Sequence, residues 1–156
     1  MELFFFRHGE SEPPGATATD DERQLTDIGR DDTRLVAETL QRAGVGFDQL
    51  FSSPLIRARQ TSEILGEAFG LQAQVTDGLR SGAELGGVQR LLTEHPAQRS
   101  LLVGHEPDLS RMIAQLIGGG RIRMGTSAVA CVQMDRIEPG AGRLMWLVTP
   151  EVLPAG

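Results

Sequence analysis

Two arginines and two histidines in this chain carry the side chains that phosphoryl transfer requires. Arg7 and His8 end a short aromatic run, and Arg57 lies near the start of a segment with a helical pattern. His105 follows a Leu-Leu-Val run. A guanidinium presents a planar fork to phosphate oxygens, and an imidazole can attack phosphorus if its other ring nitrogen is held as a donor. We therefore interpret His8 as a nucleophile that forms a covalent phosphohistidine, and the other three residues as donors to the phosphate.

Each of these residues also has a purely structural interpretation. Arg7 and His8 could be a surface pair at the end of an N-terminal strand, and His105 could cap its own strand. Arg57 could be an exposed residue of a first helical turn. A cation there opposes the helix dipole, however, so a nearby anion would explain it.

The segments around these residues predict how they are positioned. The run from Leu3 to Phe6 is typical of a strand buried on both faces, and such strands deliver their last residues to the ligand-binding edge of an α/β sheet. Gly9 would let the backbone turn and approach a ligand closely. Thr26 and Gly29 indicate a helix cap and close packing, whereas Ser127 could lend a hydroxyl or an amide to the phosphate.

The order of apolar runs and helical periods predicts the fold class. Helical patterns begin at Thr26, Ser53 and Pro107, with Ser53 as a helix cap, and a shorter one surrounds Val88. Apolar runs predict strands over 3–6, 47–52, 73–75, 100–104, 128–134 and 143–148. This alternation predicts an α/β three-layer sandwich with a mostly parallel central sheet and helices on both faces. The last two strands form a hairpin that adds an antiparallel edge.

Composition bounds the function. The 156 residues are 40% hydrophobic and 23% charged, which predicts a single domain over residues 1–156. The apolar runs are too short for a membrane span and no signal peptide is visible, so we expect a cytoplasmic protein. All 15 basic residues are arginine and the net charge is −6, which argues against a nucleic-acid partner. The absence of lysine excludes a P-loop and Schiff-base chemistry.

The segment from Glu10 to Gln24 is a long polar loop predicted to lie over the first strand end. It contains the acidic residues Glu10, Glu12, Asp20, Asp21 and Glu22. This charge could favour a basic protein surface beside a phosphohistidine. The simpler interpretation, which we prefer at this stage, is a solvated loop.

Four motifs resemble those of the histidine phosphatase superfamily. They are Arg7-His8-Gly9, Leu25-Thr26-x-x-Gly29, the segment from Ser53 to Thr61 (Ser-Pro-Leu-Ile-Arg-Ala-Arg-Gln-Thr), and Gly104-His105. The resemblance implies the same roles for Arg7, His8, Arg57 and His105, with no metal and no cofactor. Substrate contacts are expected from Gly9, Ser11, Glu84, Glu106 and Ser127.

The compact size and the Gly-His-Glu-Pro-Asp-Leu-Ser segment resemble the phosphohistidine phosphatase branch. This implies that the protein acts on a phosphorylated protein, such as a phosphotransfer domain. Nothing in the sequence argues for an oligomer, so we expect a monomer. The sequence departs from the mutase-like branch, because Pro14 stands where an asparagine is usual and only Glu84 could supply a general acid. An imidazole leaving group needs no such acid, whereas an alkoxide does. A small-molecule phosphomonoesterase and a non-catalytic phosphate-binding domain remain the alternatives.

Other phosphatase chemistries do not fit the sequence. A cysteine phosphatase needs five residues between its cysteine and arginine, but only four separate Cys131 from Arg136. A zinc site could use His8 and His105, yet no helical histidine pair or cysteine pair supports it. We therefore expect no metal.

Overall fold

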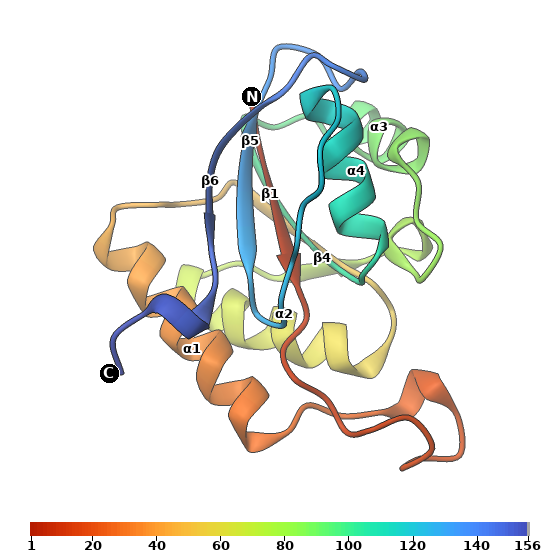
Figure 1. Cartoon of the computed structure of the whole chain (residues 1–156), viewed down its shortest axis with the longest axis vertical. Coiled ribbons are helices and arrows are strands. Elements are labelled where there is room, and N and C mark those ends of the chain that lie inside the picture. The colour runs from red at the N-terminus through yellow and green to blue at the C-terminus, as the bar shows by residue number, and fades with distance from the viewer. Residues whose placement is uncertain (156) are drawn as a thin grey trace.

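The computed structural model describes residues 1–155 as one six-stranded sheet with helices on both of its faces (Figure 1). The strands are β1 (Glu2–Arg7), β2 (Gln49–Ser52), β3 (Ala73–Val75), β4 (Arg99–Gly104), β5 (Val129–Gln133) and β6 (Arg143–Val148). The helices are α1 (Asp27–Arg42), α2 (Ile56–Phe69), α3 (Leu85–Glu94) and α4 (Asp108–Ile117). Three short 3-10 turns are η1 (Asp20–Glu22), η2 (Asp77–Leu79) and η3 (Pro150–Val152).

The sheet is mostly parallel, with strand order β3-β2-β4-β1-β5-β6. The first four strands in this order run parallel to one another, whereas β5 pairs antiparallel with both β1 and β6. The predicted fold class and the C-terminal antiparallel hairpin are thus confirmed.

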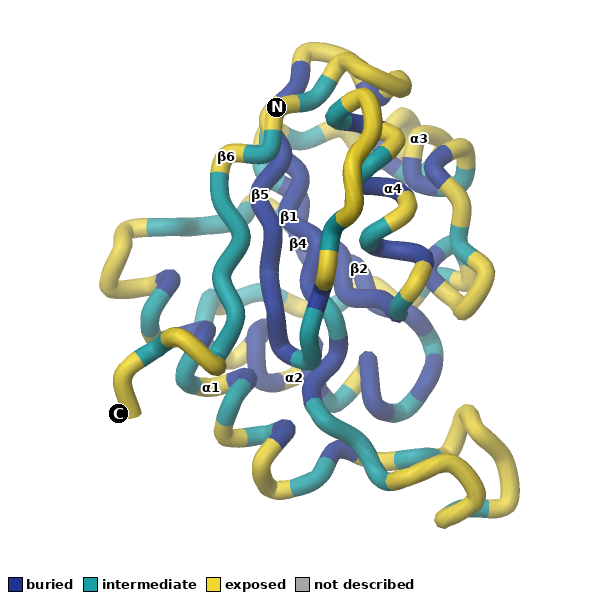
Figure 2. Tube along the Cα trace, viewed as in Figure 1, coloured by how far each residue is buried: buried dark blue, intermediate teal, exposed yellow. Residues whose placement is uncertain are grey.

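Strand β1 lies in the interior and buries both of its faces. Phe4 and Phe6 pack into a core shared with α1 and α2, whereas Leu3 and Phe5 pack into a second core shared with α3 and α4. Figure 2 shows β1, β4 and β5 as the buried centre of the molecule, with β6 only half buried at the edge. This double burial explains why the sequence of β1 shows no polar alternation.

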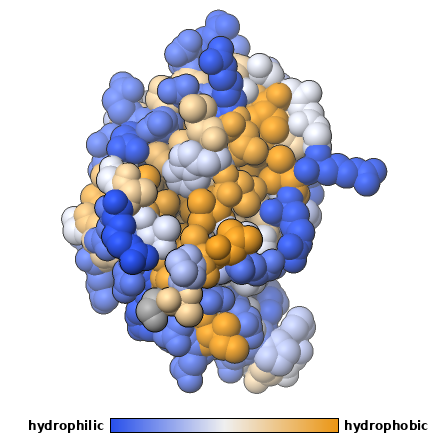
Figure 3. Space-filling view, turned by 60° about the vertical axis from the view of Figure 1, so that its left-hand side comes forward, coloured by the Kyte–Doolittle hydropathy of each residue, from blue (hydrophilic) through white to orange (hydrophobic). Residues whose placement is uncertain are grey.

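The surface of the molecule near β6 and the C-terminal segment carries exposed apolar side chains. Figure 3 shows apolar side chains gathered there among charged ones. Met145 on β6 and Val152 beyond it are 50% and 74% exposed. Within residues 1–155, no helix has the length and apolar character needed to cross a bilayer.

Parallel pairing brings three strand ends to one edge of the sheet. Arg7 is in register with Gly104, and Ser52 is in register with Val103. Since β4 lies between β1 and β2, the residue after Gly104 is flanked by the residues that follow Arg7 and Ser52. These are His105, His8 and Ser53.

Of the two helix caps predicted from the sequence, one is confirmed and one is wrong. The Thr26 hydroxyl accepts from the Gly29 amide as the predicted cap, and Gly70 ends α2 in the left-handed region at φ 67°. The prediction that Ser53 caps α2 is wrong, because the helix begins only at Ile56.

Two glycines allow the end of β1 to pack directly on α1. A Cβ on Gly9 would lie 2.6 Å from the Gly29 carbonyl oxygen, and a Cβ on Gly29 would lie 2.1 Å from the carbonyl oxygen of Glu10. Both distances are shorter than non-bonded contact allows, so neither position tolerates a side chain without a backbone shift. Gly9 therefore serves close packing on α1.

We expect Gly29→Ala to destabilise the protein by about 1–3 kcal/mol, the cost of overpacking a tight contact. Urea unfolding measures this change. Gly46→Ala is the matched control, because nothing lies within 4 Å of a Cβ at that glycine. Equal stability of the two variants would contradict the close approach of Gly29 to Glu10.

Candidate active site

His8 lies at the end of β1 with its two ring nitrogens in different environments. Nδ1 is 2.8 Å from the Gly9 carbonyl oxygen, which can only accept, so Nδ1 carries the proton. Nε2 then bears a lone pair, and Arg57 Nε donates to it at 3.4 Å. The side chain is nearly buried. This geometry presents an unprotonated Nε2 that is ready to act as a nucleophile.

The electrostatic surroundings keep His8 neutral. Burial, then the neighbouring His105, Arg57 and Arg7, lowers the pKa of His8 to about 3, although its hydrogen bond to Gly9 opposes the shift. Since the ordinary value is 6.5, the attacking nitrogen stays free of a proton at neutral pH.

Arg57, in the first turn of α2, is only 4% exposed. Besides its contact with His8, its Nη1 donates to the Asp20 backbone oxygen at 2.9 Å, and its Nη2 forms an ion pair with Asp20 Oδ2 at 3.1 Å. Asp20 is thus the anion that offsets a cation at a helix N-terminus. Burial lowers the pKa of Arg57 and Asp20 acts in the opposite direction.

Arg7 reaches the site with part of its guanidinium unused. Nη1 donates to the Met124 carbonyl oxygen at 2.9 Å. Nε is buried and has no hydrogen-bond partner among the described residues. Burial lowers the pKa of Arg7, which Glu106 partly offsets. A buried donor without a partner is costly, so it favours a bound anion.

His105, at the end of β4, shows the same incomplete hydrogen bonding. Its Nε2 lies 2.7 Å from Ser53 Oγ, whereas Nδ1 is buried and unpaired within residues 1–155. Its ring centroid is 5.2 Å from that of His8. Burial, followed by the charge of Arg57, lowers the pKa of His105 to about 4.

The structure therefore brings together the four residues that the sequence singled out. Two arginines surround a neutral nucleophilic imidazole, and a second neutral imidazole lies beside it. Arg7 Nε and His105 Nδ1 both lack partners. The arrangement can bind a phosphoryl dianion and offer Nε2 of His8 to its phosphorus atom.

Two of the expected substrate contacts, Ser11 and Glu106, are used within the protein, and a third, Glu84, lies away from the site. Ser11 lies in a bridge with Leu25, and its hydroxyl accepts from Arg23 at 3.4 Å. The Glu106 carboxylate binds the amide and the hydroxyl of Ser110 in the first turn of α4. Glu84 is exposed and lines a groove with Arg111 and Met112 that contains none of the four site residues.

Ser127 makes hydrogen bonds to the backbone at the end of β1. Its amide donates to the carbonyl oxygens of Arg7 and His8 at 3.1 and 3.2 Å. Its hydroxyl lies 3.0 Å from Thr33 Oγ1, whose own proton goes to the Gly29 carbonyl oxygen. The Ser127 hydroxyl therefore donates to Thr33. Both donors of Ser127, its amide and its hydroxyl, are thus already used inside the protein.

Three further residues hold the site, although no role in the site was predicted for any of them. Asp20 pairs with Arg57, and Ser53 bonds His105. Thr61 accepts from the Gly9 amide at 3.0 Å and donates to the Arg57 carbonyl oxygen at 2.8 Å, so it ties α2 to the end of β1. Ser53 and Thr61 both stood in a recognised motif, which was the available signal.

The loop from Glu10 to Gln24 was interpreted from the sequence as solvated, but two of its acidic residues form ion pairs with arginines. Besides its bonds to Arg57, the Asp20 carboxylate accepts from Arg23 at 2.8 Å, and Asp21 pairs with Arg80 at 2.9 Å. Slight burial raises the pKa of Asp20, but the charges of Arg57 and Arg23 outweigh it and leave this pKa below its usual value. The turn η1 is thus fastened over the site by arginines.

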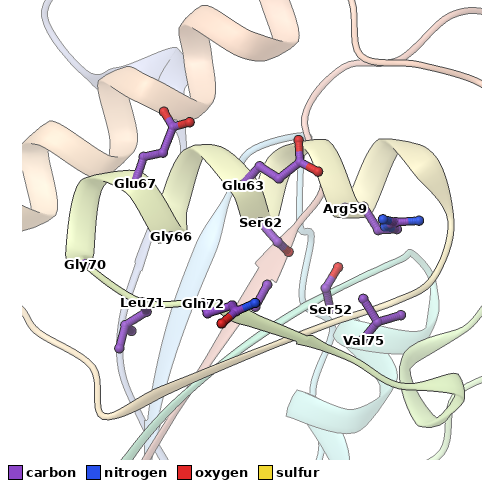
Figure 4. A pocket seen from close by; sticks show the side chains of 11 residues that line it. Ser52, Arg59, Ser62, Glu63, Gly66, Glu67, Gly70, Leu71, Gln72 and Val75 are labelled. Carbon is purple, nitrogen blue, oxygen red and sulfur yellow. The ribbon is translucent and has the colours of Figure 1, made fainter.

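A separate groove of about 580 Å³ lies between α2 and β3 and is lined by none of the four site residues. Figure 4 shows Arg59, Ser62 and Glu63 of α2 bordering it, opposite Gln72. It contains no histidine. Over residues 1–155, no group of three or more His, Cys, Asp or Glu side chains is arranged to hold a metal ion.

Comparison with known proteins identifies the family of this chain. Residues 3–82 match the profile of the histidine phosphatase superfamily, branch 1. The phosphohistidine phosphatase SixA of Escherichia coli strain K12 is 33% identical over 156 residues, covering 96% of this chain and 94% of that protein. The chain belongs to the histidine phosphatase superfamily.

Solved structures agree with this assignment. The protein histidine phosphatase SixA complexed with tungstate has a TM-score of 0.84 and 32% identity, over 96% of this chain and 97% of that one. A putative phosphohistidine phosphatase SixA from Agrobacterium tumefaciens, at 22% identity, has a TM-score of 0.80 over 96% of this chain and 97% of that one. The second likeness concerns the fold alone.

We expect the ring protons of His8 and His105 not to titrate between pH 8 and pH 5, because their pKa values lie at about 3 and about 4. The unfolded chain takes up these protons near the ordinary pKa of 6.5, so stability should also fall as the pH drops below that value. Proton NMR of the imidazole C2 positions measures the titration. A midpoint near 6.5 for either residue would contradict the burial described above.

Asp20→Asn should bind vanadate more tightly than the wild type, because a charged competitor for Arg57 is removed. The gain should be roughly 2- to 5-fold, the worth of a partly exposed ion pair. Isothermal titration calorimetry measures the affinity. Asp31→Asn is the control, since Asp31 pairs with Arg34 on the exposed face of α1. Weaker binding by Asp20→Asn alone would show that Asp20 instead orients Arg57 for the anion.

Proposed function

We propose that this protein is a phosphohistidine phosphatase that works through a covalent phosphohistidine on His8. The observation that carries the proposal is the hydrogen bonding of His8. Nδ1 is held by the Gly9 carbonyl oxygen, and the unprotonated Nε2 lies beside Arg57. The printed names of the relatives, a phosphohistidine phosphatase and a protein histidine phosphatase, support the same activity.

In the first step, Nε2 of His8 attacks the phosphorus of the substrate. A nitrogen–phosphorus bond forms on His8 as the bond to the substrate imidazole breaks, and that imidazole leaves with the bonding electron pair. The proton stays on His8 Nδ1 and is donated in a hydrogen bond to the Gly9 carbonyl oxygen, which stabilises the positive charge of the phosphorylated ring. Arg7, Arg57 and His105 donate to the three phosphoryl oxygens.

In the second step, water attacks the phosphorus atom of phospho-His8. An oxygen–phosphorus bond forms as the nitrogen–phosphorus bond breaks, the phosphate is released as dihydrogen phosphate with both protons of the water, and His8 recovers its lone pair. The same donors stabilise both transition states, since the charge on the phosphoryl oxygens is similar in each.

The position of Glu84 favours phosphohistidine over phosphate esters. Glu84 is exposed and shares its groove with Arg111, away from His8. Glu84 is therefore not placed to protonate an alkoxide, which is a poor leaving group. An imidazole has a conjugate-acid pKa of about 6.5 and leaves without such help.

The remaining parts of the proposal concern cofactors and partners. We propose that the enzyme needs no metal, because buried guanidinium groups supply the positive charge that a cation would otherwise provide. Its substrate is a phosphorylated protein, and it acts in the cytoplasm as a monomer with one domain. EDTA should leave turnover unchanged.

The proposal is tested by trapping the covalent intermediate. A peptide with ³²P-labelled phosphohistidine is mixed briefly with the enzyme and quenched in alkaline detergent, and the label should be found on His8. His8→Ala should carry no label and show no turnover. Label on another residue, or turnover by a folded His8→Ala variant, would overturn the proposal.

Arg57→Ala should lower kcat/KM by about 10²–10³-fold, as expected when a preorganised donor to the transition state is lost. Arg59→Ala is the matched control, because this arginine lies on the same helix but is exposed. Similar rates for the two variants would exclude Arg57 from the site.

Glu84→Gln should change hydrolysis of phosphohistidine and phosphoserine peptides by less than about 3-fold, and the wild type should prefer phosphohistidine. The comparison measures kcat/KM for each peptide in both proteins. A large loss confined to the phosphoserine peptide would favour a phosphomonoesterase with Glu84 as its acid.

A further inference from the structure

Ser53 is a buried serine that touches His105 but has no part in the mechanism described so far. It follows β2, where its amide continues the pairing with β4 by donating to the Val103 carbonyl oxygen at 3.0 Å. Its side chain is fully buried. The hydroxyl oxygen lies 2.7 Å from His105 Nε2 and accepts from the Leu55 amide at 3.3 Å.

The position of each proton follows from these contacts. A serine hydroxyl has one proton and two lone pairs, and the Leu55 amide uses one lone pair. If the hydroxyl proton goes to His105 Nε2, every polar group of Ser53 is satisfied. If Nε2 were the donor instead, the hydroxyl proton would be buried with no acceptor among the described residues, which is costly.

The arrangement matters because His105 is neutral. With a pKa lowered to about 4 by burial and by Arg57, the ring carries only one proton at neutral pH. A proton donated by Ser53 to Nε2 therefore requires that the ring's own proton sits on Nδ1. Nδ1 is the buried ring atom that has no partner within residues 1–155.

We propose that Ser53 is a positioning residue that holds His105 in the Nδ1–H tautomer, so that this imidazole donates a hydrogen bond to a phosphoryl oxygen. The inference rests on the proposed function, because the phosphoryl group is the acceptor. In the opposite tautomer, the Nδ1 lone pair would face phosphate oxygens and repel them. A neutral histidine serves as a donor here only because its neighbour decides which nitrogen carries the proton.

Nitrogen NMR tests the tautomer directly. The chain has 3 histidines, so ¹⁵N-labelled imidazoles are readily assigned with His8→Asn and His95→Asn variants. In the wild type at pH 7, His105 should show a protonated Nδ1 and an unprotonated Nε2. In Ser53→Ala, the signals should shift toward a mixture of both tautomers. A proton on Nε2 of His105 in the wild type would overturn the inference.

Binding and kinetics test the consequence. Ser53→Ala should weaken vanadate binding and lower kcat/KM by roughly 3- to 10-fold, the value of one hydrogen bond. Ser53→Thr keeps a hydroxyl and should restore the wild-type tautomer. Ser52→Ala is the matched control, because Ser52 is equally buried but its hydroxyl donates to the Ser53 carbonyl oxygen at 2.9 Å.

The outcomes separate this inference from the proposed function. Normal vanadate binding and turnover in Ser53→Ala, equal to those of Ser52→Ala, would overturn only the role of Ser53. A wild-type protein that neither binds vanadate nor hydrolyses phosphohistidine would overturn the proposed function, and with it the assignment of His105 as a donor.

Discussion

Parallel pairing of β1, β4 and β2 aligns three strand ends, and the geometry of the candidate site depends on that alignment. The register sets Arg7 opposite Gly104 and Ser52 opposite Val103. The next residue of each strand, outside the ladder, then meets its neighbours at one edge of the sheet. Parallel α/β sheets place ligands at this edge because the chain leaves the buried core there and polar side chains reach solvent.

The second constraint is electrostatic. The buried Arg57 and the half-buried Arg7 next to two histidines would be unstable with four positive charges, and the protein avoids this by keeping both imidazoles neutral. The Asp20 carboxylate offsets part of the remaining charge on Arg57. The unused donors, on Arg7 and His105, are left for an anion. The same burial that makes the arginines costly makes them strong ligands for phosphate.

The two histidines differ in the hydrogen bond that holds each ring, to a backbone carbonyl oxygen for His8 and to a serine hydroxyl for His105. His8 is held through Nδ1 by the carbonyl oxygen of the next residue, so Nε2 is exposed to the site as a lone pair. His105 is held through Nε2 by a buried hydroxyl, so Nδ1 is the atom left over. Two imidazoles whose ring centroids are 5.2 Å apart can thus serve different roles, His8 as a nucleophile and His105 as a hydrogen-bond donor.

The sequence alone determined the fold class, the buried strand β1, the Thr26 cap and the four residues that meet at the site. These follow from local patterns, namely apolar runs, cap residues and motifs at strand ends. Only the tertiary structure decided that Asp20 pairs with Arg57 and that Ser53 bonds a histidine rather than capping α2. Both contacts join residues more than 35 positions apart, with separations of 37 and 52, and no local pattern encodes such a partner. Proton positions and pKa shifts arise in the same way, because burial and neighbouring charges exist only once the chain has folded.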